Sequence, residues 1–287
     1  MELDLTTIQK IISIQYPKYT SFEIRKVVKS GHDNQTFHLG NSFSLRFPSG
    51  LEYASQVLKE HQFCKKLQES ISILITEPIE LGQPSELFPY HFSINRWIEG
   101  ESINEFNVKD KNQLAYDLAK FLNELKHCDP QVGPLPGPHN FYRGGDLSTY
   151  HEETIQAIKA CDIFDQNECL KIWNSGLNSR FDGPNTWIHG DLEKDNLLIK
   201  DNRLYAVIDF GNMGIGDPSC DYVMAWTYFD KESRQVFLQA LGIDSATINR
   251  SKAWALWKAL ISLNKVKTRL IAINTINELL SDSEAKK

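Results

Sequence analysis

The segment at residues 187–211 constrains the fold of this chain more than any other. It reads WIHGDLEKDNLLIKDNRLYAVIDFG. Two short apolar runs, at residues 196–199 and 204–208, flank Asp201-Asn202, and such residues are typical of tight hairpin turns. The pattern predicts a β-hairpin that folds the chain back on itself, so that the polar residues at its two ends lie side by side.

The polar residues around this hairpin come in a characteristic order. The tripeptide H-G-D at residues 189–191 precedes it, Asn196 follows the aspartate by five residues, and D-F-G at residues 209–211 closes it. This is the H-x-D-x-x-x-x-N and D-F-G set of the kinase signature, with glycine where protein kinases usually carry arginine. Each piece alone would suit a hairpin with solvated carboxylates, but all three in this order favour phosphoryl transfer.

Phosphoryl transfer explains why these residue types are needed. The moving phosphoryl group spreads negative charge over its oxygens, and divalent cations held by hard oxygen ligands neutralise that charge. Asp209 and Asn196 can supply such ligands, and Asp191 can accept the hydrogen of an attacking hydroxyl. We interpret His189 differently, as a packed imidazole that supports the catalytic loop by hydrogen bonding.

A charged pair is expected in the first part of the chain. Residues 42–47 alternate between polar and apolar side chains, which predicts a strand with Arg46 on its polar face. Glu60 lies in the apolar stripe of a predicted helix. Because an unpaired buried carboxylate is costly, Glu60 should find a cation, and an Arg46–Glu60 pair matches the strand-lysine to helix-glutamate pair of kinases. A purely structural ion pair is the alternative.

The remaining patterns predict an α+β chain with two lobes. The N-terminal part is mixed β and α and ends with a strand over His91–Trp97, after which Glu99-Gly100-Glu101 breaks the pattern. The later part is mainly helical, apart from the hairpin and a Pro- and Gly-rich connection. We expect a β-rich N-terminal lobe over residues 1–97 and a larger helical lobe over residues 98–287. Helical patterns cover residues 114–125, 150–177 and most of the last sixty.

Composition excludes several classes of protein. A net charge of −6 argues against nonspecific nucleic-acid binding, which needs basic patches, and suits either a cationic ligand or solubility alone. The five cysteines are scattered without C-x-x-C spacing, so neither a disulfide framework nor a zinc site is expected. The chain opens with no signal-peptide pattern and has no membrane-spanning apolar run. We therefore expect a cytoplasmic protein without a membrane partner.

The chain resembles the aminoglycoside phosphotransferases and their relatives, which share the protein-kinase-like fold. The resemblance covers nearly the whole chain and is most specific in INRWIEGE, WIHGDLEKDN, VIDFG and GDPSCDY. It implies a two-lobed, Mg²⁺-dependent enzyme that transfers the γ-phosphoryl group of ATP or GTP to a hydroxyl of a small molecule. By this resemblance Asp191 is the catalytic base, and Asn196 and Asp209 bind magnesium.

The resemblance also assigns the nucleotide site. Residues 30–36 would form a loop over the phosphates, and residues 96–98 would contact the nucleobase through backbone groups. Asp217-Pro218 is typical of a helix start, and the resemblance makes Asp221 a brace for the catalytic loop. The expected nucleotide-binding residues are Ser30, Gly31, Asn34, Arg46, Glu60, Arg96, Trp97 and Ile98.

Acceptor recognition is less legible in the sequence. A polycationic amino sugar would need carboxylates, and these recur in the segments expected to wall the acceptor cleft. Aromatic residues there could stack on a sugar, although core packing explains them equally well. The candidate acceptor-binding residues are Glu193, Trp226, Tyr228 and Asp230.

Several functions remain open at this stage. The acceptor could be a cationic, hydroxyl-rich molecule such as an aminoglycoside, or a macrolide, another antibiotic or a metabolic alcohol; the family includes antibiotic-resistance enzymes. A degenerate kinase fold that binds nucleotide as a regulatory protein is the rival, supported only by Arg46 in place of the usual lysine. A protein kinase is a third reading, but no A-P-E segment follows D-F-G. Oligomeric state and the choice between ATP and GTP stay undetermined.

Overall fold

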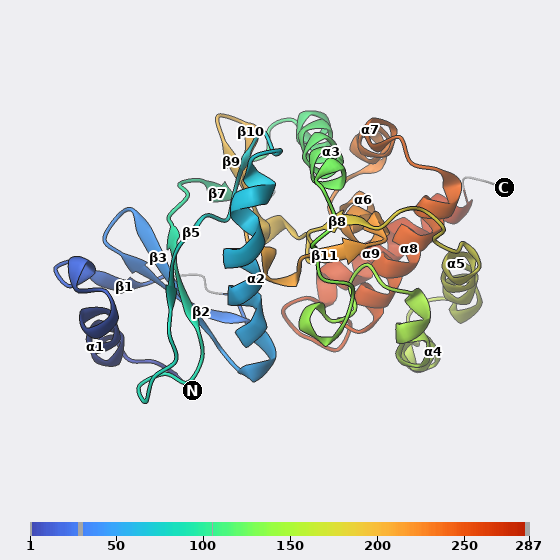
Figure 1. Cartoon of the computed structure of the whole chain (residues 1–287). Helices are drawn as coiled ribbons and strands as arrows, with labels where there is room; N and C mark the ends of the chain where they lie inside the picture. Colours follow the sequence, from blue (N-terminus) through green and yellow to red (C-terminus); the bar gives the residue numbers. More distant parts are fainter. Residues whose placement is uncertain (1, 28–30, 105, 285–287) are drawn as a thin grey trace.

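The computed structural model describes residues 2–27, 31–104 and 106–284. Figure 1 shows a sheet-rich N-terminal part, the long helix α2 (Leu51–Gln68) beside it, and a mainly helical C-terminal part. The α+β class with this distribution of strands and helices is as the sequence predicts. Division into lobes at residue 97 stays a prediction.

The N-terminal sheet is antiparallel throughout and carries different chemistry on its two faces. One face, with Leu45, Phe47 and Ile94, packs on α1 (Leu5–Gln15) in a separate apolar core. The alternation of β3 sends Ser44 and Arg46 to the other face, which α2 contacts. The strand order is β1 (Ile24–Lys26), β2 (Asn34–Leu39), β3 (Phe43–Pro48), β6 (Phe92–Arg96) and β5 (Pro78–Gly82).

The predicted hairpin is present as β9 (Leu197–Lys200) and β10 (Arg203–Val207). Asp201 and Asn202 both have positive φ, 51° and 61°, as a type I′ turn requires. The hairpin belongs to a four-stranded sheet in which β4 (Leu74–Ile75) runs parallel to β10 and β7 (Glu101–Ser102) pairs with β9. The hairpin is thereby tied to chain segments that lie far before it in the sequence.

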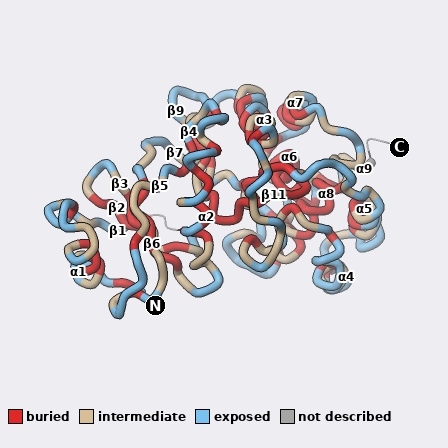
Figure 2. Tube along the Cα trace, viewed as in Figure 1, coloured by how far each residue is buried: buried red, intermediate tan, exposed pale blue. Residues whose placement is uncertain are grey.

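The C-terminal part is built around α8, whose residues 250–257 are all buried. Figure 2 shows buried residues concentrated along α6 and α8. The strands β8 (Thr186–Ile188) and β11 (Gly214–Gly216) form a small ribbon on either side of the hairpin in sequence. The helices are α3 (Lys111–His127), α4 (His151–Ala160), α5 (Gln166–Asn178), α6 (Met224–Thr227), α7 (Lys231–Leu241), α8 (Ser245–Leu260) and α9 (Arg269–Glu284).

Two expectations need correction or comment. The predicted helical stretch at residues 150–177 is divided, because α4 ends at Ala160 and Asp165 caps a new helix, accepting the backbone N–H groups of Asn167 and Glu168. The five cysteines are buried and form no disulfide. Within the described ranges, no helix has the length and apolar character needed to cross a bilayer.

Candidate active site

A buried carboxylate holds the backbone of the catalytic loop between β8 and β9. Asp221 accepts the backbone N–H groups of His189 at 2.6 Å and Gly190 at 2.8 Å. His189 is fully buried; its Nε2 bonds to the carbonyl oxygen of Ile208 at 3.0 Å, and Nδ1 accepts from the Asp191 N–H at 3.2 Å. The structural interpretation of His189 and the bracing role of Asp221 are confirmed. Burial raises the pKa of Asp221.

Glycine in the H-G-D tripeptide has a local cause. Gly190 has φ of +82°, in the left-handed region that side chains disfavour. A Cβ built there would lie 2.3 Å from the carbonyl oxygen of Asn212. The close approach brings the catalytic loop directly against the segment that follows D-F-G.

The hairpin brings Asn196 and Asp209 together, as expected. The Ile208 N–H donates to the Asn196 carbonyl at 2.9 Å, which places Asp209 one residue beyond that bond. Asn196 Nδ2 donates to the Asp191 carbonyl oxygen at 3.0 Å, so its Oδ1 is the atom left to act as a ligand. Asp209 has φ of +66° and its N–H donates to Thr76 Oγ1 at 2.9 Å. Its carboxylate keeps 36% exposure.

Arg46 joins three elements at the site. Its Nη1 lies 2.9 and 3.0 Å from the two carboxylate oxygens of Glu60, which confirms the predicted pair. Its Nη2 lies 2.6 Å from Asp209 Oδ1, a contact that the sequence did not indicate. Although burial acts to lower the pKa of Arg46, the two carboxylates raise it further above its usual range, while burial raises the pKa of Glu60. Arg46 therefore serves as a fork between α2 and D-F-G.

Helix α2 also contacts the segment after D-F-G through residues that sequence reasoning missed. Gln56 Nε2 donates to Asn212 Oδ1 at 3.1 Å. Lys59 Nζ donates to the carbonyl oxygens of Met213 at 3.3 Å and His139 at 3.0 Å. Burial lowers the pKa of Lys59 to about 7. The sequence could have indicated this contact, because Lys59 lies among the apolar residues of a predicted helix. In the structure it is buried and donates to backbone carbonyl groups.

The predicted phosphate loop is described only in part. Ser30 lies outside the described residues. A Cβ at Gly31 would have no atom within 4 Å, and Asn34, 5% exposed, begins β2. Between them, Asp33 Oδ2 accepts from Gln56 Nε2 at 3.1 Å. Burial raises the pKa of Asp33, and the charges of the carboxylates of the catalytic centre add to the rise, so this loop lies near that centre.

The segment expected to contact the nucleobase already uses two of its N–H groups. The Arg96 N–H donates to Glu77 at 2.8 Å and the Trp97 N–H to Ser42 at 2.9 Å, both through carbonyl oxygens. The Trp97 indole packs 4.1 Å from the His38 ring, measured between centroids. The backbone groups of this segment that remain as candidates for contacting a base are therefore the N–H group of Ile98 and the carbonyl groups.

Asp191 is surrounded by charge. Lys258 Nζ, from α8, lies 3.0 Å from Asp191 Oδ1 and 2.5 Å from Glu193 Oε1. Burial acts to raise the pKa of Asp191, but the charges of Lys258 and Arg143 lower it overall. Sequence reasoning missed both cations, since neither lies near the signature in the chain. Of the predicted acceptor residues, the structure brings Glu193 to Asp191.

The other predicted acceptor residues have different surroundings. Trp226 is 1% exposed and packs in the main core. Tyr228 Oη lies 3.4 Å from the carbonyl oxygen of Asn104. Asp230 caps α7 and pairs with Lys111 at 3.6 Å. None of these contacts is with Asp191, so the acceptor proposal below does not use them.

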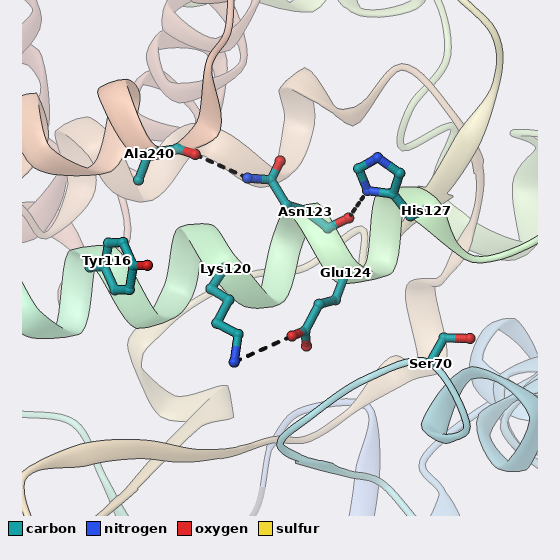
Figure 3. Close-up of a pocket in the computed structure, with 7 residues that line it drawn as sticks. All are labelled: Ser70, Tyr116, Lys120, Asn123, Glu124, His127 and Ala240. Atoms are coloured by element: carbon teal, nitrogen blue, oxygen red, sulfur yellow. Dashed lines mark hydrogen bonds and ion pairs between the residues drawn. The ribbon is translucent and has the colours of Figure 1, made fainter.

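A separate cavity of about 570 Å³ lies along α3, away from this chemistry. In Figure 3, Lys120 faces Glu124, and Asn123 donates to the carbonyl oxygen of Ala240. None of the residues expected to take part in phosphoryl transfer lines it. Its other lining residues are Ser70, Tyr116 and His127.

Comparison with solved structures gives the same fold. The chain is similar to aminoglycoside 2'-phosphotransferase-IIIa in its GDP complex, at 19% identity over 98% of this chain and 100% of that one, with a TM-score of 0.74. ADP-bound aminoglycoside phosphotransferase APH(2'')-Ib matches at 21% identity, 97% of each chain and a TM-score of 0.62. Macrolide 2'-phosphotransferase MphH from Brachybacterium faecium matches at 14% identity, 96% and 98% coverage and a TM-score of 0.64.

The sequence itself supports the same assignment. The model of the phosphotransferase enzyme family (APH) matches residues 25–259, which include the catalytic loop, the hairpin and all of α8 except its last residue. The match spans most of the chain and confirms the resemblance noted from the motifs. The chain therefore belongs to the phosphotransferase enzyme family.

Proposed function

We propose that this protein is a small-molecule kinase that transfers the γ-phosphoryl group of ATP or GTP to a hydroxyl group. One observation carries the proposal: a single hairpin brings the Asp191 loop, Asn196 and Asp209 together, and Arg46 ties Asp209 to α2. Phosphoryl transfer needs little covalent chemistry from a protein, and depends on positioning and charge. This arrangement supplies both.

Each residue has a distinct role in this scheme. Asp191, 34% exposed, accepts the hydrogen of the acceptor hydroxyl and aims its oxygen at the phosphorus. Arg46 contacts phosphate oxygens through its guanidinium group, while Glu60 holds it in place. The loop at residues 31–36 lies over the phosphates, and Ile98 contacts the base.

The residues present fit a magnesium ion. Asp209 offers a carboxylate and Asn196 an amide oxygen, and Mg²⁺ prefers hard oxygen ligands completed by water and substrate phosphates. No group of three His, Cys, Asp or Glu side chains that could hold a metal occurs within the described residues, so the remaining ligands in this proposal are water and substrate phosphates. When bound, the ion would neutralise charge on the phosphates. Asp209 and Asn196 would hold it.

The acceptor class is open among hydroxyl-bearing small molecules. A cationic amino sugar was our expectation from the sequence, and aminoglycoside phosphotransferases are similar in fold. Three carboxylates of the segments expected to wall the acceptor cleft already have partners. Glu193 pairs with Lys258, Asp230 pairs with Lys111, and Glu153 accepts from Trp257 Nε1 at 2.7 Å.

The central test is Asp191→Asn, which keeps the side chain's size and removes its charge. We expect transfer to fall by about a hundredfold or more, as for other positioned bases, while nucleotide still binds. Nucleotide turnover across an acceptor panel, with binding measured separately by calorimetry, reports both quantities. Near-normal turnover would refute the assignment of the base. Binding without any turnover in the wild type would favour a regulatory nucleotide-binding protein.

A second test separates the two metal ligands. Asp209→Ala should weaken magnesium-dependent nucleotide binding more than Asn196→Ala, because a carboxylate binds a divalent cation more strongly than an amide oxygen. Magnesium titrations of each variant at fixed nucleotide concentration measure this. The reverse order would mean that the two roles are misassigned.

A further inference from the structure

The two carboxylates at the proposed base already share a cationic partner. Lys258 bridges Asp191 and Glu193 with one ammonium group, at 3.0 and 2.5 Å. The three side chains keep exposures of 28%, 34% and 47%, so all remain accessible. An ammonium group of an acceptor would have to displace Lys258 from both carboxylates before it could bind there.

A second cation lies in the same neighbourhood without an anionic partner. The guanidinium carbon of Arg143 lies 4.5 Å from the Trp257 ring and 5.9 Å from the Tyr150 ring, measured to their centroids. Its Nη1 is 3.5 Å from Tyr150 Oη. In the part of the chain that the structure describes, no carboxylate lies within ion-pair distance of Arg143. Trp257, on which Arg143 stacks, directly precedes Lys258 in α8, so Arg143 lies beside the same part of that helix as the Lys258–Asp191 pair.

The surroundings of Arg143 fix its position before any ligand arrives. The fully buried Asn140 donates Nδ2 to the Arg143 carbonyl oxygen at 3.1 Å. The next residue, Gly144, accepts the Asp217 N–H at 2.9 Å. Stacking on aromatic rings holds a guanidinium plane and leaves its edge free to donate. The structure therefore holds a preorganised cation near the proposed base.

We propose that Arg143 binds an anionic group of the acceptor, so that the acceptor is an alcohol carrying a carboxylate or a phosphate. The inference rests on the proposed kinase function and names its substrate class. The guanidinium fork matches either anion through two parallel hydrogen bonds. With its anion on Arg143, the acceptor presents a hydroxyl to Asp191. Lys258 keeps Asp191 and Glu193 from binding an ammonium group instead.

The first experiment compares four acceptors on one pyranose ring: glucosamine, glucose, glucuronate and glucose 6-phosphate. With Mg-ATP and Mg-GTP, we expect kcat/KM to be at least about tenfold higher for one of the two anions than for glucose, with glucosamine lowest. Comparison of kcat/KM for glucuronate and glucose 6-phosphate shows whether the site prefers a carboxylate or a phosphate. Higher kcat/KM for glucosamine or glucose would overturn the inference and leave the kinase function standing.

The variant Arg143→Met tests the residue itself. It should raise KM for the preferred anion roughly tenfold to a hundredfold, with a much smaller change for glucose. Arg143→Lys, which keeps charge but loses the fork, should fall between. Arg25→Met is the matched control, since Arg25 is an exposed residue of β1 paired with Glu23 at 3.3 Å. An equal loss on all acceptors would show a structural role only and refute the proposal.

A binding measurement keeps the inference testable without turnover. In saturating Mg-ADP, which fills the phosphate sites, glucuronate or glucose 6-phosphate should raise the Tm of the wild type and of Arg25→Met. Glucose should not, and Arg143→Met should lose the rise. If neither anion gives an Arg143-dependent rise, the inference is wrong. If no acceptor gives turnover that Asp191→Asn abolishes, the result counts against the proposed function instead.

Discussion

Removal of Arg46 should expose how strongly the site depends on one buried cation. Arg46 is 11% exposed and Glu60 2%, so Arg46→Met leaves a buried carboxylate without its partner. Breaking such a pair from one side costs about 3–5 kcal/mol. We expect the upper half of that range, because Asp209 loses its 2.6 Å partner at the same time. Glu60→Leu should cost less, about 1–3 kcal/mol, since Arg46 retains Asp209.

The double variant Arg46→Met/Glu60→Leu isolates the interaction. It replaces the ion pair by apolar side chains, so its stability should return to within about 1–2 kcal/mol of the wild type. Urea unfolding at pH 7 without nucleotide, followed by circular dichroism, gives the four free energies of the cycle. The nucleotide affinity of the folded double variant then shows whether Arg46 contributes to nucleotide binding, apart from its effect on stability.

In turnover assays, Arg46→Lys should retain much of the wild-type activity, whereas Arg46→Ala should weaken it.

Two outcomes would refute this reasoning. If each single variant costs under about 0.5 kcal/mol and the costs simply add, Arg46 and Glu60 are not energetically coupled. If the double variant binds and turns over nucleotide like the wild type, Arg46 does not contact the phosphates.

Two further predictions concern Asp221 and Lys59, which are buried and hydrogen-bond to backbone groups of the segments around the site. Asp221→Ala removes the acceptor for the N–H groups of His189 and Gly190, so we expect about 2–5 kcal/mol lower unfolding free energy and reduced kcat; unchanged urea midpoints would contradict the brace. Lys59, with a pKa of about 7 when folded and its usual value of 10.5 when unfolded, binds fewer protons in the folded state between these values, so its contribution to stability rises with pH. Compared with Lys59→Met, the free energy of unfolding of the wild type should therefore rise by about 2 kcal/mol between pH 7 and pH 9, measured by urea unfolding. If the two proteins show the same dependence of stability on pH, Lys59 is not buried as a neutral amine.

The sequence by itself determined the chemistry of the site because that chemistry is local. The H-G-D loop and Asn196 come directly before one hairpin and Asp209 directly after it, so the turn residues of that hairpin bring the two ends together. The Arg46–Glu60 pair was also predictable, since a carboxylate in an apolar helix stripe must find a cation and a polar strand face offered one. The helix expected over residues 150–177 was a single run in pattern, but an N-cap divides it.

Only the tertiary structure decided what surrounds the base. Lys258 reaches Asp191 from a helix more than sixty residues later, and its place in a largely buried helix gave no sign of a partner. Arg143 sits in an irregular loop whose path depends on the buried Asn140 and on aromatic rings from α8. For Trp226 the sequence left stacking on a sugar and core packing equally open, and the structure places it in the core. Local hydrogen bonding and turn chemistry specify neighbours along the chain, whereas contacts between distant elements depend on how whole faces pack.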